Sequence, residues 1–209
     1  MHILRHAQQA YPQSLEEQEK IVGEIVSGHS PNTLILTEHP PTYTLGTSAH
    51  EHDVLSRQVD GTSIAVYPTG RGGEATYHGP GQLVCYALMN IEREKDLHQH
   101  VHRLEELMMR TLADFQIAAE RNTRGIGVWV NGLKIAAIGV RCRKWVTFHG
   151  VALNINPNLK HFSGIVPCGM RDAPVTSMHQ EGIQATRQDV EERIIHHAEV
   201  LFGNTSISE

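Results

Sequence analysis

The chain has 209 residues, of which 40% are hydrophobic and 20% are charged, a composition typical of a folded globular protein. Its formal net charge of −5 argues against a dedicated nucleic-acid-binding protein, and no apolar run approaches the ~20 residues that cross a bilayer. Three cysteines are too few for a disulfide framework, and the N-terminus lacks the apolar core of a signal peptide. We therefore expect a cytoplasmic protein that binds neither nucleic acid nor membrane.

The first third of the chain predicts one helix and three short strands. Ser14 and Glu17 form a capping-box pattern that begins a helix, and Gly28 ends it. Between them, apolar residues recur at helical spacing. Extended segments bounded by prolines then predict strands at residues 34–37, 42–46 and 64–67.

The middle of the chain predicts a strand, a long helix and two hairpins. Residues 83–89 alternate as a strand, and Asp96 caps a helix whose apolar stripe consists of Leu97, Val101, Leu104, Met108, Leu112 and Phe115. In the hairpins that follow, Asn131-Gly132 predicts a type I′ turn. Residues 141–144 are expected to form a polar connection between the second and third strands.

The last helix is predicted to begin after a box-like cap at Thr186 and to stop at Gly203. Helices therefore flank a set of hairpin-connected strands, without the strand–helix alternation of a doubly wound sheet. This pattern predicts an α+β fold with a largely antiparallel or mixed sheet. We expect residues 1–209 to form a single domain.

Of the three thiols, Cys168 is the candidate nucleophile. Cys85 lies on an alternating strand and is interpreted as a buried apolar residue, and Cys142, in a predicted polar turn, as an ordinary surface thiol. Cys168 lies between Pro167 and Gly169 in a loop whose backbone N–H groups could face an acyl oxygen. From the spacing of residues alone, Cys168 could also be an unreactive loop cysteine.

Lys134 is the candidate partner of this thiol. The thiolate is the reactive form of cysteine, and a nearby ammonium stabilises it. Lys134 begins a strand with apolar neighbours, so its charge would be partly desolvated and its proton more easily given up. The alternative is a hairpin lysine that extends to water.

Residues 70–82 form a glycine-rich segment that matches neither phosphate-binding pattern. No Gly-Lys-Ser/Thr follows the glycines, and a strand rather than a helix comes next. Arg71 and His78 offer a cation and a neutral donor, while Thr76-Tyr77 offers hydroxyls and an apolar face. The segment suits the wall of an acyl-chain groove, with a plain turn as the alternative.

Two other polar clusters have simple structural interpretations. The HQHVH segment, residues 98–102, lacks the glutamate of an H-E-x-x-H motif and is interpreted as a solvated helix face, so no metal site is predicted. Arg141, Arg143 and Lys144 form either a solvated turn or a docking patch for an acidic protein.

Four segments together carry a resemblance: RGGEATYHGPGQ, NGLKIAAIGVR, FHGVALNIN and VPCGM. In order and spacing they closely resemble the lipoyl/octanoyl transferase family. The resemblance implies the biotin/lipoate protein ligase fold, with a central mixed sheet and flanking helices. It also implies transfer of an octanoyl or lipoyl group from acyl carrier protein to a lysine of lipoyl domains, in 2-oxo acid dehydrogenases and the glycine cleavage H protein.

By the same resemblance, Cys168 matches the acyl-thioester nucleophile and Lys134 the lysine that tunes it. The matching substrate-binding residues are Arg71, Gly72, Gly73, Glu74, Ala75, Thr76, Tyr77, His78, Ala137, Ile138, Gly139, Gly150, Val151 and Ala152. Glu74 occupies a position that the family leaves variable, so it is not counted as catalytic. No metal or cofactor is implied, and we expect a monomer.

Two rival functions remain. A ligase of the same fold would activate a free fatty or lipoic acid with ATP, but such ligases lack a cysteine nucleophile, so Cys168 favours the transferase. A non-enzymatic acyl-binding protein would leave Cys168 inert.

Overall fold

A computed structural model of the chain describes residues 1–166 and 174–203. Within these ranges, a seven-stranded sheet forms the centre of the molecule, with the order β1-β2-β8-β12-β11-β10-β9. Its strands are β1 (His2–Arg5), β2 (Thr33–Thr37), β8 (Gln82–Leu88), β12 (Val146–Asn154), β11 (Leu133–Arg143), β10 (Gly125–Val130) and β9 (Glu120–Asn122). The β1–β2 pair is parallel and the other pairs are antiparallel, so the predicted mixed, largely antiparallel sheet is confirmed.

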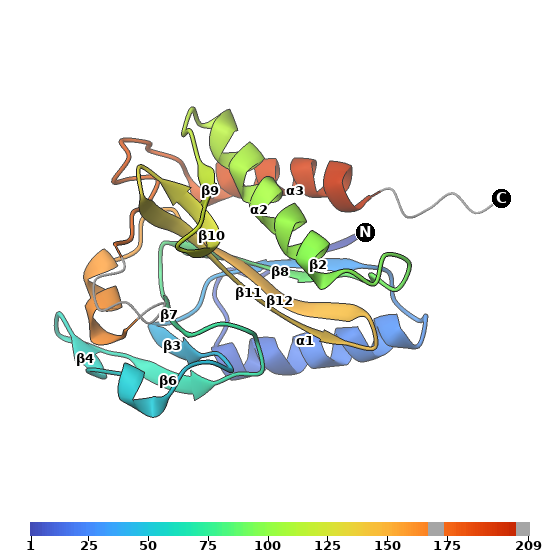
Figure 1. The fold of residues 1–209 in the computed structure, drawn as a ribbon, viewed down its shortest axis with the longest axis horizontal. Coiled ribbons are helices and arrows are strands. Elements are labelled where there is room, and N and C mark those ends of the chain that lie inside the picture. The colour runs from blue at the N-terminus through green and yellow to red at the C-terminus, as the bar shows by residue number, and fades with distance from the viewer. Residues whose placement is uncertain (167–173, 204–209) are drawn as a thin grey trace.

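Helices cover both faces of this sheet (Figure 1). Helix α1 (Tyr11–Val26) packs against β8 and β12 through Val22 and Ile25. On the opposite face, α2 (Leu97–Asp114) and α3 (Arg187–Phe202) contact each other and close the main apolar core, which includes Leu104, Met108 and Ile194. The α+β fold class follows from this arrangement.

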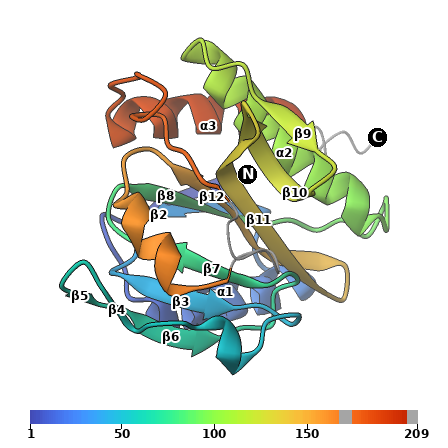
Figure 2. The same cartoon turned by 60° about the vertical axis from the view of Figure 1, so that its left-hand side comes forward.

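A smaller sheet lies on the α1 side of the large one (Figure 2). It contains β6 (Ala65–Pro68), β3 (Thr42–Leu45) and β7 (Ala75–His78), and β4 (Gln58–Val59) pairs with β5 (Thr62–Ser63) beside it. Two 3-10 helices, η1 (Glu51–Asp53) and η2 (Leu159–Gly164), complete the elements of the described ranges. Because β7 lies inside the glycine-rich segment, the smaller sheet holds that segment in place across from the large sheet.

Local signals predict several boundaries correctly. The Asp96 side chain accepts a hydrogen bond from the backbone N–H of Gln99, and Thr186 forms a reciprocal capping box with Asp189. The turn residues Asn131 and Gly132 have φ of 49° and 79°, as a type I′ turn requires.

Two predicted boundaries are wrong. The first helix begins at Tyr11 rather than after Ser14, because Pro12 fits the first turn and Ala10 is the N-cap residue, so Ser14 is a buried helical residue. The strand β11 continues through Arg143, and Lys144 and Trp145, with φ of 49° and 60°, form the turn. A two-residue turn therefore replaces the expected polar connection.

Burial also corrects some interpretations. Cys142 lies on β11 and is half-buried rather than in an exposed turn, whereas Cys85 is buried as predicted. His100 is buried against Phe202, although His98 and His102 on the same helix are exposed. In the described ranges, no helix combines the length and apolar character needed to span a bilayer.

Candidate active site

A cavity of about 470 Å³ is lined by the large sheet, by the glycine-rich segment and by the first turns of α2. It gathers residues predicted from three distant parts of the sequence: Arg71, Gly72, Gly73, Glu74, Ala75, Thr76, His78, Lys134, Ala137, Ile138, Gly139, Gly150, Val151 and Ala152. Tyr77 is not among the lining residues, and Cys168 lies outside the described residues. A cavity of this volume is large enough for a small-molecule ligand.

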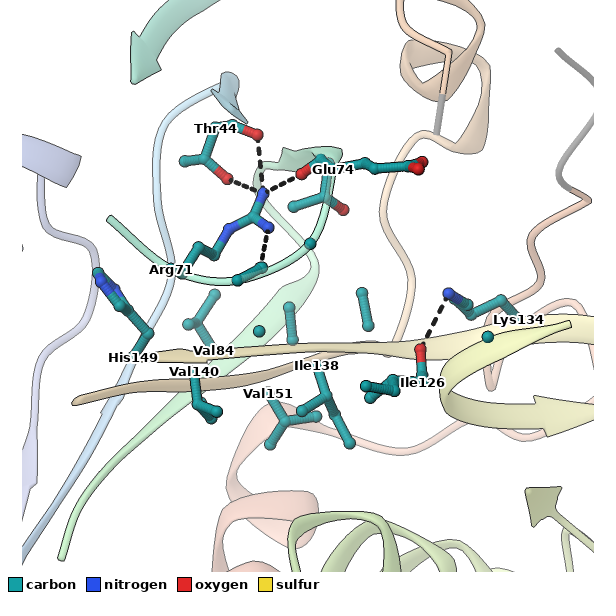
Figure 3. Close-up of a pocket in the computed structure, with 18 of the residues that line it drawn as sticks. Thr44, Arg71, Glu74, Val84, Ile126, Lys134, Ile138, Val140, His149 and Val151 are labelled. Carbon is teal, nitrogen blue, oxygen red and sulfur yellow. Dashed lines mark hydrogen bonds between the residues drawn. The ribbon is translucent and has the colours of Figure 1, made fainter. Parts of the chain in front are cut away.

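The Arg71 guanidinium holds the glycine-rich loop in shape (Figure 3). Its Nη2 donates to the carbonyl and the hydroxyl of Thr44 and to the carbonyl of Glu74, at 2.8–3.0 Å, and its Nη1 donates to the carbonyl of Gly72. Arg71 is 9% exposed, so these bonds form largely out of water. The predicted substrate-binding arginine therefore organises the cavity wall through backbone acceptors.

A buried hydrogen-bond network continues from this arginine. The Thr44 hydroxyl contacts His78 Nε2, and His78 Nδ1 contacts Gln82 Oε1 at 2.8 Å. Gln82 then donates to Asn154 Oδ1, and Asn154 donates to the carbonyl of Thr176. Burial lowers the pKa of His78 to about 3, so its ring is neutral near pH 7. With His78 neutral, this network of hydrogen bonds connects the glycine-rich segment to β12 across the cavity.

Tyr77 points to the other side of β7, because successive side chains of a strand alternate. Its hydroxyl lies 2.7 Å from His161 Nδ1, and its ring packs against Tyr43 and Phe162. Tyr77 thus supports the smaller sheet from behind the cavity wall.

Lys134 enters the cavity from the start of β11. The residue is 9% exposed, its Nζ donates to the carbonyl of Ile126 at 3.1 Å, and the same atom lies 4.8 Å from the centre of the Trp129 ring. These partners stabilise an ammonium in a largely dry site. Figure 3 shows this lysine on the same side of the strands as Arg71.

The backbone of Lys134 holds the segment that follows the predicted cysteine loop in the sequence. The Lys134 N–H donates to the carbonyl of Pro174, and the Thr176 N–H donates to the carbonyl of Lys134, at 2.9 and 3.0 Å. Pro174 is six residues after Cys168 in the sequence. The Asn154 amide fixes the same segment through Thr176.

Gly127 leaves room for the Lys134 side chain. It has φ of +136°, and a Cβ there would lie 2.6 Å from the Ala136 carbonyl oxygen and 3.3 Å from Lys134 Cε. We expect Gly127→Ala to lower the free energy of unfolding by about 2 kcal/mol, through backbone strain and overpacking. Denaturant unfolding measures this, with Gly23→Ala as the control because a Cβ at Gly23 meets nothing within 4 Å. Equal stability of the two variants would contradict the prediction.

Strands β11 and β12 form the floor of the cavity. Gly139 pairs with Gly150, and a Cβ at Gly139 would lie 2.9 Å from Arg71 Cδ. The missing side chain therefore lets the arginine lie on the sheet. Ile138 and Val151 point to the opposite side of the strands, toward α2, and contact the apolar core (Figure 3). Leu97 and Val101 of α2 line the part of the cavity that reaches this side.

Several lining residues were not predicted as site residues. They include Tyr11, Tyr86, His149 and Asn154, which come from α1, β8 and β12. Each lies in a segment with an ordinary helix or strand pattern, so the sequence contains no local signal for its role. The quoted FHGVALNIN segment contains His149 and Asn154 and was the one available indication.

The fold defines the class of protein. The structure resembles a putative lipoate protein ligase from T. acidophilum with bound lipoic acid, with TM-score 0.69 and 15% identity, covering 97% of this chain and 86% of that chain. It also resembles the biotin protein ligase from Aquifex aeolicus in complex with biotin and ATP, with TM-score 0.61 and 14% identity, covering 97% and 70%. The protein therefore has the lipoate/biotin protein ligase fold.

The sequence comparisons identify the family within this class. The model of the lipoyl protein ligase A/B catalytic domain matches residues 10–199, and the chain belongs to this family. The octanoyltransferase of Paramagnetospirillum magneticum is 47% identical over 199 residues, covering 92% of each chain. That of Rhodospirillum rubrum is 46% identical over 200 residues, covering 93% of this chain and 91% of the relative.

Proposed function

We infer that the chain is an octanoyltransferase, an acyltransferase that transfers octanoyl groups in protein lipoylation. Relatives at 46–47% identity, aligned over more than nine-tenths of both chains, are octanoyltransferases. The observation that carries the chemistry is the buried Lys134 ammonium in an acyl-sized cavity. The family match over residues 10–199 supports treating residues 1–209 as a single catalytic domain.

We propose that Cys168 is the nucleophile. Its thiolate attacks the carbonyl carbon of the donor thioester, and a bond from Sγ to this carbon forms as the bond to the donor sulfur breaks. The departing thiolate takes a proton from the Lys134 ammonium. Support comes from the Pro-Cys-Gly motif and from the backbone pairing of Lys134 with residues 174 and 176.

The second half-reaction releases the acyl group. The neutral amine of an acceptor lysine attacks the acyl-cysteine carbonyl, the bond to Sγ breaks, and an amide forms. The amine proton passes to the Lys134 amine, which restores its ammonium for the next cycle. Exchange between thioesters is nearly isoenergetic and amide formation is downhill, so this chemistry requires no nucleotide and no metal.

We propose acyl carrier protein as the donor. The acceptors would be lipoyl domains of 2-oxo acid dehydrogenases and of the glycine cleavage H protein, with the enzyme acting as a cytoplasmic monomer. Arg141 and Arg143 lie exposed at the β11–β12 hairpin with their guanidinium groups over the Phe148 ring. They offer a basic surface to an acidic carrier.

Incubation with octanoyl carrier protein alone tests the mechanism. We expect intact-mass analysis to show the enzyme heavier by one octanoyl group, and peptide mapping to place it on Cys168. Cys168→Ala is expected to form no adduct, whereas Cys142→Ala is a matched control that keeps it. Absence of an adduct, with turnover of free acid that depends on ATP, would instead support the ligase alternative.

A further inference from the structure

The peptide group that accepts a hydrogen bond from Lys134 also donates one to a buried carboxylate. Lys134 Nζ donates to the carbonyl of Ile126 at 3.1 Å (Figure 3). The N–H of the same peptide group belongs to Gly127 and donates to Oε1 of Glu105 at 3.3 Å. A trans peptide group is planar, so its N–H and C=O point in opposite directions. This peptide therefore lies between a carboxylate and an ammonium, and a bond that fixes its N–H also fixes its carbonyl.

Glu105 is a charged residue on the covered side of α2. It is 5% exposed, so its carboxylate needs partners. Its Oε2 accepts from Arg121 Nε at 2.8 Å and lies 3.1 Å from His102 Nδ1. With Oε2 held by these two side chains, Oε1 is directed at the N–H of Gly127 on β10.

The N–H of Gly127 lies in an irregular part of β10. The pairing of β10 with β9 shifts register between Gly125 and Trp129, and its pairing with β11 shifts between Val128 and Trp129. Regular ladder bonds set the direction of each peptide group in a strand, and an irregularity re-aims the groups inside it. Gly127 also has φ of +136°, which side chains rarely adopt. A side-chain acceptor such as the Glu105 carboxylate then sets the direction of the peptide.

We propose that Glu105 is a positioning residue: its carboxylate fixes the Ile126–Gly127 peptide so that the carbonyl holds the Lys134 ammonium at the cavity. This inference rests on the proposed function, in which Lys134 gives its proton to the departing thiolate. The carboxylate also polarises the peptide group, which makes the carbonyl a stronger acceptor for an ammonium. Glu105 itself does not line the cavity, so it acts through the peptide and not on the acyl group.

Glu105→Gln keeps the size of the side chain but replaces one carboxylate oxygen with a donor. Because the bond from Arg121 is shorter and charged, the amide oxygen should face Arg121 and the NH₂ group should face the N–H of Gly127. Two donors then oppose each other, the peptide turns, and the carbonyl of Ile126 is lost as an acceptor. A hydrogen bond to a charged group corresponds to about tenfold or more in an equilibrium constant. The ammonium should therefore lose its proton about one pH unit lower in this variant.

Two measurements detect this change. Acetic anhydride acylates neutral amines, so labelling of Lys134 across pH, followed by peptide mass spectrometry, shows where its ammonium loses the proton. The exposed Lys160 is an internal reference in the same samples. In single-turnover acylation by octanoyl carrier protein, the alkaline limb of the pH–rate profile should move to lower pH by the same amount.

Arg121→Gln is the matched control, because it breaks the ion pair with Glu105 and leaves the bond from Gly127 in place. Its labelling and its pH–rate profile should equal those of the unmodified protein. In the double variant Glu105→Gln/Arg121→Gln, no cation competes for the amide oxygen, which can again accept from Gly127, so both profiles should recover. Glu105→Leu offers no acceptor and should repeat the shift of Glu105→Gln.

These variants separate positioning from a simple tie between α2 and the strands. A tie would lower stability in Arg121→Gln and Glu105→Gln alike and would shift neither profile. Unchanged labelling of Lys134 in Glu105→Gln and Glu105→Leu would overturn the inference, as would an equal shift in Arg121→Gln. Failure of the unmodified enzyme to load octanoyl would instead overturn the proposed function, and the labelling would still show whether Glu105 positions Lys134.

Discussion

Lys134→Met is expected to lower the rate of octanoyl transfer to the enzyme by about 10²- to 10⁴-fold, the range of general acid catalysis. Methionine has nearly the length and apolar stem of lysine, so it can still pack near the Trp129 ring, but it loses the cation–π interaction that Lys134 Nζ makes there. In the proposed mechanism, methionine can neither supply the proton that the leaving thiolate takes nor stabilise the attacking thiolate. The loss should therefore appear in the chemical step rather than in binding.

Single-turnover kinetics with octanoyl carrier protein measure this loss across pH. If Lys134 is the neighbour of Cys168, as the proposed mechanism requires, the reaction of Cys168 with iodoacetamide should also move to higher pH in the variant, because the thiolate loses that cation. Lys160→Met is the control, since Lys160 lies on η2 at the surface with Asp60 as its ion-pair partner. An unchanged pH–rate profile in Lys134→Met would remove this lysine from the mechanism.

Short-range signals explain why much of the architecture was predictable. The Asp96 and Thr186 caps and the Asn131-Gly132 turn each depend on residues that are neighbours in the sequence. They set the ends of two helices and one hairpin, and that hairpin places Lys134. The predicted start of the first helix was wrong because the sequence contains two competing start signals. The helix begins before Pro12, which fits its first turn, and not at the capping-box pattern of Ser14.

The site was less predictable because its geometry depends on long-range contacts. Arg71 stays a predicted substrate-binding residue, and its hydrogen bonds to Thr44, on another strand, could not be derived from the sequence. Tyr77 lies in the same motif as His78, and strand alternation turns the two side chains apart. His149 lies in an ordinary strand pattern. Its place at the cavity depends on pairing with β11 and on the hydrogen bond from its backbone N–H to Gln18 of α1, which the sequence does not reveal.

Arg71→Lys is expected to lower octanoyl transfer about 100-fold and the free energy of unfolding by about 2–3 kcal/mol. The guanidinium serves three backbone carbonyls and one hydroxyl from two nitrogens. A single ammonium cannot reach all four acceptors, so at least one buried oxygen is left unsatisfied. The Thr44 hydroxyl, which also contacts His78, would lose its fixed orientation and loosen the network toward Asn154.

Two measurements together separate this role from direct substrate binding. If Arg71 organises the wall, Arg71→Lys lowers both stability without substrate and the rate at saturating donor. If it contacts the acyl donor instead, stability is unchanged and the loss appears in the donor concentration needed for half-maximal rate. Arg103→Lys is the control, because Arg103 bonds Glu94 and Gln99 on the surface of α2. A charge-conserving change that affects folding and turnover together would show that the glycine-rich loop acts through its shape, which one guanidinium maintains.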